Sequence, residues 1–331
     1  MNKKAISAVW LAETDLTNLN AGIGGSNLVD LKKYKKDGVD YPYVSGQAMR
    51  YYLKEGIRRL VDSKEYCIAN EKGETCGDIE NCILCDLFGF MTTLKEQGAQ
   101  IRVSPIKMSP AMGLLPLNDN LTIDFLTRKK PQGEEGKLSG DIVNVELGVN
   151  LYKAGLSIDL AKVGGEEVIE NGHIKINKKV KDETVKKGRV KIALEAFKNL
   201  SDYSKQARVL TDFTPNFILI AIQNRYNHLL QKAIELTDVK NVKDGKKLNT
   251  ERLDQVLRAF KDETIYAGLL SGTLDNEDEI KEVLAKYISR RGGNTKEGTG
   301  DNEDENKKGN GAVIKFMTPT EAINRVISEV E

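Results

Sequence analysis

The sequence predicts an α+β fold, in which a sheet of mainly antiparallel strands carries helices and inserted hairpins. Strand and helix patterns interleave along the 331 residues, and hairpin signals dominate the middle of the chain. The clearest signal is Asn171-Gly172, which interrupts an alternating segment over residues 168–180 and is typical of a two-residue hairpin turn. A doubly wound parallel sheet would instead alternate strands with crossover helices. Hydrophobic residues make up 40% and charged residues 30%, a balance typical of a globular protein with a sizeable core.

The N-terminal part predicts a strand followed by a loop. Residues 6–11, ISAVWL, form an apolar run suited to a buried strand. Residues 18–27 are polar and rich in glycine, which favours a loop over a helix. We expect this loop to become ordered when a ligand binds, and Asn18 and Asn20 are its candidate binding residues.

A helix is expected from Ser45 to about residue 62. Pro42 precedes it, Ser45 is a suitable N-cap, and apolar residues recur at helical spacing. The positions of this apolar face are Met49, Tyr52, Leu53, Ile57, Leu60 and Val61. On another face, Arg50, Lys54 and Arg58 lie four residues apart and form a basic stripe. Taken alone, such a stripe is most simply a solvated surface.

Short apolar or alternating runs predict the remaining strands. They cover residues 101–108 (broken at Pro105), 121–127, 142–147, 156–160, 217–222 and 264–270. Two of them, 121–127 and 142–147, flank a turn-rich segment that contains Arg128 and Lys129. This arrangement predicts a long protruding hairpin with a mobile tip.

Helical patterns recur from residue 178 onward. A lysine-rich stretch, 178–191, leads into a helix that reaches residue 200, and further helices are expected over 226–236, 250–260, 275–288 and 318–330. Residues 290–311 contain no aliphatic residue, a composition that predicts a disordered linker. The chain therefore divides into a main domain (1–289), this linker and a C-terminal helical segment (312–331), in which Pro319 occupies the first helical position.

The overall charge leaves the class of partner open. Lys and Arg number 50 and Asp and Glu number 49, for a formal net charge of +1, and such a total can conceal a basic face balanced by an acidic one. The longest apolar run has six residues, 217–222, far below the ~18 that span a membrane. We therefore expect no membrane partner. The N-terminus reaches Glu13 before a signal-like apolar region develops, and we expect a cytoplasmic protein.

Recognisable catalytic and nucleotide-binding motifs are missing from the sequence. It has no GxxxxGK[ST] and no GxGxxG after a strand, the patterns that cradle phosphates. His173 and His228 have no Cys, Asp or His at ligand or triad spacing, so we expect both to be structural or surface residues. No carboxylate pair is marked out for acid–base chemistry. We expect neither an organic cofactor nor a catalytic centre.

All four cysteines fall within 19 positions, an arrangement that needs a cause. Cys67, Cys76, Cys82 and Cys85 have the spacing C-x8-C-x5-C-x2-C. A CxxC pair lets two thiolates hold one metal from a tight turn, and two further thiolates complete a closed tetrahedral zinc site. The sequence therefore makes this cluster a candidate for structural zinc.

Roles for the cysteines without zinc also stay open. Standard zinc ribbons pair two CxxC units, and this chain has one. Reduced cysteines could simply pack, with Cys82 and Cys85 beneath Leu87 and Phe88. Redox catalysis is less favoured because no thioredoxin-like strand leads into the CxxC, and a structural disulfide is disfavoured in a reducing cytoplasm.

Four sequence elements, in order, resemble a known family. They are the strand, the glycine-rich loop and VSGQAMRYYLKEGIRR; then CILCDLFGF; then RVSPIKMSPAM; and finally LSDYSKQARVLTDFTPNFILIAI. Together they span residues 6–222 and are similar to the Cas-seven (DevR-type) backbone subunits of type I CRISPR effector complexes (Cascade), with an I-B-like subtype the nearest. Beyond about residue 241 we find no independent match.

The resemblance implies a fold, a function and a set of partners. The fold would be a modified RRM-like (ferredoxin-like) palm, with a finger at about residues 63–100 and a thumb at about 116–147. The function would be non-catalytic: copies would stack head to tail along a CRISPR RNA and present its spacer for pairing with target DNA in antiviral defence. The implied partners are CRISPR RNA, target DNA, further copies of the chain and other Cascade subunits.

Such a role calls for contacts to the RNA backbone rather than to base edges. Helix N-termini, amide donors and cations meet that need. An RRM would instead stack bases on its RNP aromatics, and no RNP pattern appears here. The candidate RNA-binding residues are Asn18, Asn20, Ser45, Gly46, Gln47, Arg50, Lys54, Arg128, Lys129, Lys205, Gln206 and Arg208.

Two alternative functions compete with the RNA-binding scaffold. The first is an endoribonuclease like the type III backbone subunits, which cut target RNA with an Asp in the loop after the first strand; Asp15 and Asp30 lie in the comparable region. An Asp alone would also need a metal and a positioned phosphate. The second is a zinc-stabilised protein-interaction scaffold in which the basic stripe is merely solvated.

Overall fold

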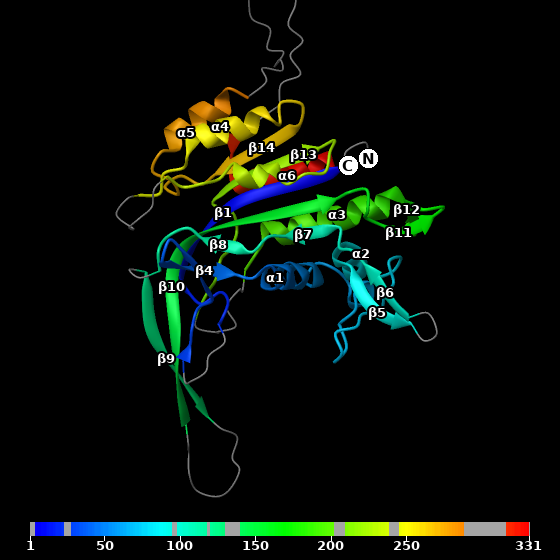
Figure 1. The fold of residues 1–331 in the computed structure, drawn as a ribbon, viewed down its shortest axis with the longest axis horizontal. Coiled ribbons are helices and arrows are strands. Elements are labelled where there is room, and N and C mark those ends of the chain that lie inside the picture. Colours follow the sequence, from blue (N-terminus) through cyan, green and yellow to red (C-terminus); the bar gives the residue numbers. More distant parts are fainter. Residues whose placement is uncertain are drawn as a thin grey trace, which may run out of the picture.

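An 11-stranded sheet forms the framework of the protein. The structure is a computed structural model that describes residues 4–22, 28–94, 98–117, 120–129, 140–201, 209–237, 245–287 and 316–330. Within the sheet, hydrogen-bonded neighbours follow the order β15-β14-β13-β1-β10-β8-β4-β3, and β2, β7 and β9 pair separately with β10 (Figure 1). With a large antiparallel sheet and few helices, the fold is α+β, as the sequence predicts.

Three strands that are far apart in the sequence form the centre of the sheet. β1 (Ala5–Thr17) lies between β10 (Gly140–Asp159) and β13 (Phe217–Gln223), and both pairings are antiparallel. Alternate β1 side chains enter two separate cores: Trp10 belongs to one, and Leu11 to the other. Because both faces of the sheet are covered here, residues 8–12 of β1 and 217–222 of β13 are continuous apolar runs rather than alternating ones.

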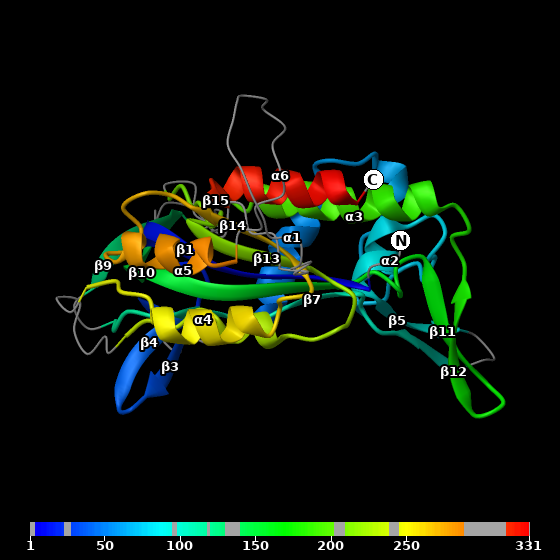
Figure 2. The same cartoon turned by 90° about the horizontal axis from the view of Figure 1, so that it is seen from above.

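Helices cover the two faces of the sheet (Figures 1 and 2). The first core receives residues from α1 (Gly46–Arg58), α2 (Ile83–Phe88), α3 (Glu183–Lys198) and α6 (Pro319–Glu329). The second receives residues from the short 3-10 helix η2 (Leu229–Lys232), α4 (Thr250–Arg258) and α5 (Glu277–Ala285). No described helix is long and apolar enough to cross a membrane.

Shorter strands complete the sheet and two small hairpins. The remaining strands of the main sheet are β2 (Leu28–Val29), β3 (Lys33–Lys36), β4 (Val39–Val44), β7 (Ile106–Met108), β8 (Ala111–Gly113), β9 (Leu121–Lys129), β14 (Thr264–Leu269) and β15 (Phe316–Met317). The two-stranded sheets are β5 (Phe90–Leu94) with β6 (Gly98–Arg102), and β11 (Gly165–Glu170) with β12 (His173–Lys178). A second 3-10 helix, η1 (Ser63–Glu65), follows α1.

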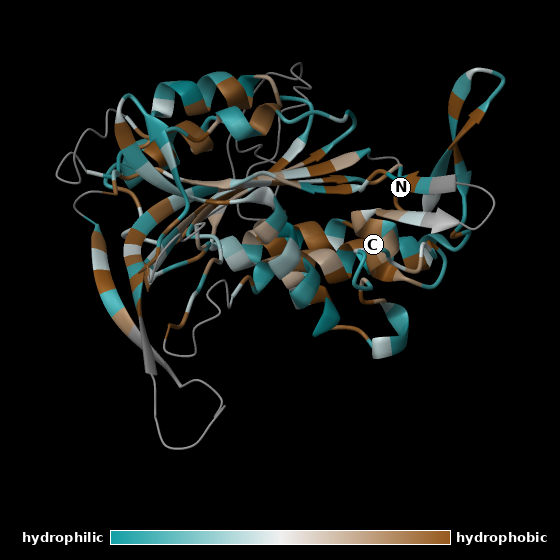
Figure 3. Cartoon of the chain, turned by 60° about the horizontal axis from the view of Figure 1, so that its bottom comes forward, coloured by the Kyte–Doolittle hydropathy of each residue, from teal (hydrophilic) through white to brown (hydrophobic). Residues whose placement is uncertain are grey.

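Two hairpins project from opposite ends of the molecule, with α1 between them. The β9–β10 hairpin leaves one end of the sheet, and β5–β6 lies at the other end (Figures 1 and 2). Hydrophobic and hydrophilic residues alternate along β9–β10 (Figure 3), and Ile123 and Phe125 of β9 are exposed. This is the protruding hairpin that the turn-rich segment predicts.

A buried ionic network ties α2 to its surroundings. The Asp86 side chain is fully buried and accepts hydrogen bonds from Arg102 and Arg189, each at 2.7 Å, and from the amide of Gly164 at 2.8 Å. Arg102 also donates to the carbonyls of Asp86 and Lys162. One carboxylate thereby connects α2, β6 and α3.

The structure corrects two predicted helices. The helix expected over 226–236 is reduced to η2, because the carbonyls of Lys232 and Ile234 accept hydrogen bonds from the side chains of Arg252 and Lys153 rather than from later turns of a helix. The helix expected to reach residue 62 ends at Arg58, since Asp62 caps the next element, η1, with a capping box.

The predicted strands 142–147 and 156–160 are parts of one strand, the 20-residue β10. The hairpin around Asn171-Gly172 is confirmed as β11–β12, and Pro319 is confirmed at the start of α6. The predicted linker, 290–311, lies outside the described residues.

Candidate nucleic-acid interface

The N-terminus of α1 presents unpaired backbone donors. Ser45 is the N-cap, and its hydroxyl oxygen accepts a hydrogen bond from the amide of Ala48 at 3.3 Å. The Ser45 amide donates to the side-chain oxygen of Asn20 at 3.0 Å. The next two amides, of Gly46 and Gln47, have no partner within the helix, and no acidic residue occupies the first turn. This helix end is therefore partially positive and able to receive an anion.

A cleft of about 470 Å³ opens beside this helix end. We call it the α1 cleft; its lining residues are Gly46, Gln47, Arg50, Tyr51, Lys54 and Met108. The structure thus brings together four of the predicted RNA-binding residues: Gly46, Gln47, Arg50 and Lys54. Ser45 caps the same helix end, and Asn20 is bonded to its amide. Gly46 allows the close approach of α1 to β7, because a Cβ at this position would lie 3.3 Å from the carbonyl oxygen of Met108.

Arg50 and Lys54 lie over the ring of Phe88. The guanidinium carbon of Arg50 is 5.7 Å from the ring centroid and the Lys54 ammonium is 5.2 Å away. Arg50 also donates to the carbonyl oxygen of Phe88 at 2.6 Å. Such cation–π contacts fix both cations without neutralising them.

No described carboxylate pairs with Arg50 or Lys54. Burial lowers the pKa of Arg50. Burial also lowers the pKa of Lys54, and the positive charges of Arg50 and Arg58 lower it further. The charges of Cys85 and Cys67 act on Lys54 in the opposite direction. A phosphate bound in the cleft would stabilise the charged form of both cations.

Arg58, the third residue of the basic stripe, behaves differently. It pairs with Glu55 one turn earlier and stacks on the ring of Tyr66 at 5.6 Å. The stripe is therefore divided: Arg50 and Lys54 face the α1 cleft, and the partly buried Arg58 is neutralised by Glu55.

The other predicted RNA-binding residues lie elsewhere. Asn18 is buried, and its side-chain amide donates to the carbonyl of Glu146 at 3.0 Å, so contact with RNA would require it to leave this position. Arg128 and Lys129 lie near the end of β9, opposite Asp141 and Gly140, and their side chains fall outside the described part of the chain. Lys205, Gln206 and Arg208 also lie outside the described residues, and the roles of all these residues stay predictions.

The four cysteines converge on one point. Cys67, which follows η1, Cys76 in the next loop, and Cys82 and Cys85 of the α2 turn place all four sulfur atoms within 4.8 Å of one another. Cys82 and Cys85 are buried, whereas Cys76 is exposed. The amide of Cys85 donates to the sulfur of Cys82 at 3.4 Å, and a hydrogen bond from the Cys85 thiol lowers the pKa of Cys82.

The spacing of these sulfur atoms fits a tetrahedral metal. Zinc–sulfur bonds of ~2.3 Å place tetrahedral thiolates about 3.8 Å apart. The observed sulfur–sulfur distances are 3.5 Å for Cys76–Cys85, 3.6 Å for Cys67–Cys85 and 3.7 Å for Cys82–Cys67. They are too long for a disulfide bond. The cluster can therefore bind a metal ion.

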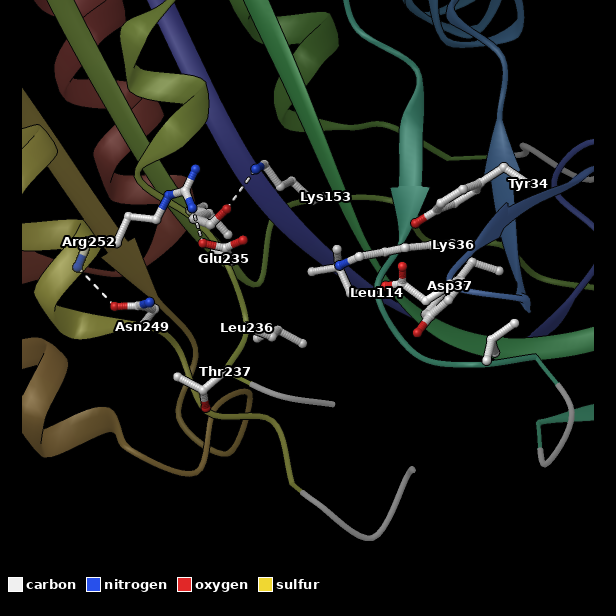
Figure 4. Close-up of a pocket in the computed structure, with 13 residues that line it drawn as sticks. Tyr34, Lys36, Asp37, Leu114, Lys153, Glu235, Leu236, Thr237, Asn249 and Arg252 are labelled. Carbon is white, nitrogen blue, oxygen red and sulfur yellow. Dashed lines mark hydrogen bonds and ion pairs between the residues drawn. The ribbon is translucent and has the colours of Figure 1, made fainter. Parts of the chain in front are cut away.

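A larger cleft, of about 800 Å³, lies between the β3–β4 hairpin and the segment before α4 (Figure 4). It is less suited to an anion, because two carboxylates, Asp37 and Glu235, are part of its lining. Glu235 pairs with Arg252, and Lys153 donates to the carbonyl of Ile234 at 2.6 Å.

Sequence reasoning missed three residues of the α1 cleft region, Tyr51, Phe88 and Met108. Helical spacing could have found Tyr51, because it lies four residues after Gln47 and therefore on the same face of the helix. No sequence signal points to Phe88, whose role depends on packing between α2 and α1.

Comparisons with known proteins identify the family. The sequence model described as "CRISPR-associated negative auto-regulator DevR/Csa2" matches residues 9–243. The chain therefore belongs to the DevR/Csa2 family of CRISPR-associated proteins, as the resemblance implies. No curated protein sequence matches it.

Solved structures share the fold. A chain of a "CRISPR RNA-guided surveillance complex" is 14% identical with a TM-score of 0.53, and the match covers 99% of this chain and 100% of that one. A chain of a "CRISPR RNA-guided surveillance complex, pre-nicking" is 10% identical with a TM-score of 0.54, with the same coverage. At these identities the likeness concerns the fold.

Proposed function

We propose that this protein is a non-catalytic backbone subunit of a CRISPR surveillance complex that binds CRISPR RNA through its sugar-phosphate chain. Copies would line up head to tail along the guide and present its spacer for pairing with target DNA, alongside other Cascade subunits. Family membership and the names of the structures that share the fold support this proposal.

The α1 cleft carries the RNA-binding part of the proposal. Two cations, Arg50 and Lys54, are fixed over Phe88 with no described carboxylate to neutralise them, next to the amides of Gly46 and Gln47, which have no partner within the helix. Cations held beside the amides of a helix N-terminus suit a phosphate, which carries no sequence information. Binding at this site would therefore be independent of the RNA sequence.

The test uses Lys54→Gln and two single-stranded RNAs of unrelated sequence. The variant removes one cation and leaves a neutral polar side chain that is one methylene shorter, so affinity should fall equally for both RNAs. The slope of log K against log salt should fall by about 0.7, the share of one phosphate contact on a single strand. Lys175→Gln on β12 is the matched control, because Lys175 is exposed and already paired with Glu170. Affinity that ignores salt, or a loss confined to one RNA, would contradict the proposal.

The proposal that copies assemble head to tail rests on the positions of the thumb and finger segments. An RRM-like palm would carry the thumb (about 116–147) at one end and the finger (about 63–100) at the other, with α1 between them. A contact between unlike ends does not close by two-fold symmetry, so it continues along the RNA. Mass photometry with RNAs of increasing length should show stepwise addition of copies; one copy on every length would refute this arrangement.

We propose that the cysteine cluster holds structural zinc. Four thiolates at tetrahedral spacing match a closed structural site, which leaves no position for a catalytic water. Zinc bound there would join the loop after η1 to the start of α2. Elemental analysis of protein purified without chelator should give one zinc per chain, and Cys82→Ser together with Cys85→Ser should abolish it.

The ribonuclease alternative has weaker support. Asp15 is exposed on β1 and Asp30 follows β2, yet the only candidate metal cluster among the described residues is the cysteine set. Incubating the assembled protein with complementary RNA and a divalent metal decides the matter. Regularly spaced cuts that disappear in Asp15→Ala or Asp30→Ala would favour cleavage over the scaffold.

A further inference from the structure

The β11–β12 hairpin carries a row of three exposed isoleucines. Ile169 of β11 lies directly opposite Ile174 of β12, and Ile176 follows Ile174 by two residues and so lies on the same face. Their side chains are 80%, 72% and 40% exposed. Adjoining apolar side chains at the surface, unlike scattered ones, mark a site of interaction. We call this surface the isoleucine face.

Contacts between the hairpin and its own chain use the opposite face. Side chains alternate between the two faces along a strand, so Glu166 lies on the face away from Ile169. Glu166 accepts a hydrogen bond from Gln100 of β6 at 2.9 Å and pairs with Lys179 at 3.0 Å. The side of the hairpin toward β6 is therefore covered, and the isoleucine face is the side that stays exposed.

The charges that share the isoleucine face already have partners within the chain. Glu167 and Lys178 are the charged residues on this face. The first pairs with Lys162 at 2.7 Å, and the second pairs with Glu183 at 3.5 Å. A charged partner would find no unmatched counter-charge here, so an uncharged apolar surface fits this face better.

A matching apolar pair lies at the opposite end of the molecule, on β9 (Figures 1 and 2). Ile123 and Phe125 are exposed and two residues apart on one face of β9, the same spacing as the two isoleucines of β12. Glu146 lies opposite Ile123 and is neutralised by Lys33 at 3.0 Å. Because the two apolar faces lie at opposite ends, β9 of one chain can cover only the isoleucine face of another.

We propose that the isoleucine face is the docking surface for the β9–β10 hairpin of a second copy of this chain. The inference rests on the proposed head-to-tail assembly and names the residues of its contact. The two strand faces pack as facing sheets do, about 10 Å apart, with Ile123 and Phe125 of one copy against the isoleucines of the next. Since the two surfaces differ, each added copy presents a new isoleucine face and the contact repeats.

The experiment pairs two charge substitutions in the full chain. Ile174→Glu and Ile123→Lys each place an unmatched charge in the contact. On an RNA long enough for several copies, mass photometry resolves additions of 36.8 kDa. Either variant should weaken addition of the second copy, relative to the first, by about 10-fold or more. The double variant should restore addition, because opposite charges then meet across the contact.

Ile101→Glu on β6 is the matched control. Ile101 is an exposed apolar residue at the same end of the molecule. It lies on the face of β6 away from β11, because the neighbouring residue Arg102 donates to the carbonyl of Gly165. Copies of this variant should add as the wild type does. All the replaced side chains are exposed, so circular dichroism should give the melting temperature of the wild type.

The outcomes separate this contact from the proposed function. Stepwise addition that survives both single substitutions, or that Ile101→Glu weakens equally, overturns the contact and leaves head-to-tail assembly standing. Single variants that fail to add, with no rescue in the double variant, overturn β9 as the occupant. One copy of the wild type on every RNA overturns the proposed assembly itself.

Discussion

Removing the charge of Asp86 should destabilise the protein strongly. Asp86→Asn keeps the shape of the side chain but leaves Arg102 and Arg189 facing each other in the core, where their side chains are 6% and 8% exposed. Breaking a buried pair by removing one partner costs about 3–5 kcal/mol. Here one carboxylate serves two cations, so we expect a loss at the upper end of that range. At about 2–4 °C per kcal/mol, a loss of about 5 kcal/mol should lower the melting temperature by ~10–20 °C.

The single tryptophan makes this measurement direct. Trp10 is fully buried in the core to which α2 belongs, so its fluorescence reports loss of that packing during heating or urea titration. Asp278→Asn is the control, because Asp278 is 98% exposed and its loss should change stability by less than about 0.5 kcal/mol. If Asp86→Asn were as stable as this control, the network would not hold α2 in place and the reasoning would be wrong.

Three further predictions concern backbone, metal and pH. Gly89→Ala should destabilise the protein by at least ~1 kcal/mol more than Gly73→Ala in thermal unfolding, because both glycines have positive φ but only at Gly89 would a Cβ lie within 2.3 Å of a carbonyl oxygen; equal losses would contradict the role given to this contact. Removal of zinc with a strong chelator should lower the melting temperature and make the cysteines reactive to a thiol reagent, while re-added zinc restores both; unchanged reactivity would argue against the metal. Burial, and to a lesser degree the charge of Tyr41, raises the pKa of Tyr34 to about 12, so the folded protein holds this proton more tightly than the unfolded chain. Stability should therefore fall as pH rises from about 10 to 12, and in urea titrations Tyr34→Phe should lose less over that range than the wild type.

Local patterns predicted much of the α1 cleft. The N-cap at Ser45 and the spacing of Arg50 and Lys54 depend on neighbouring residues, so periodicity and capping rules give them directly. The contact of Arg50 with Phe88 could not be predicted, because it joins residues 38 positions apart through a loop whose path depends on the cysteine cluster and on Asp86.

The length of β10 was likewise hidden from sequence reasoning. Its middle contains Gly148 and Gly155, which lower strand propensity and divide the pattern into two short runs. Pairing with β1 over most of its length overrides that local preference.

The central position of β1 has a consequence for synthesis on the ribosome. Its two partners are β10 and β13, and Ala5 pairs with Asp159 on one side and with Gln223 on the other. Both pairings can form only after these later residues have been synthesised. Until then a nascent chain carries an unpaired apolar strand, the kind of segment that invites aggregation. Slow closure of these distant pairings would make chaperones, or prompt assembly with other chains, important to the yield of this protein in the cell.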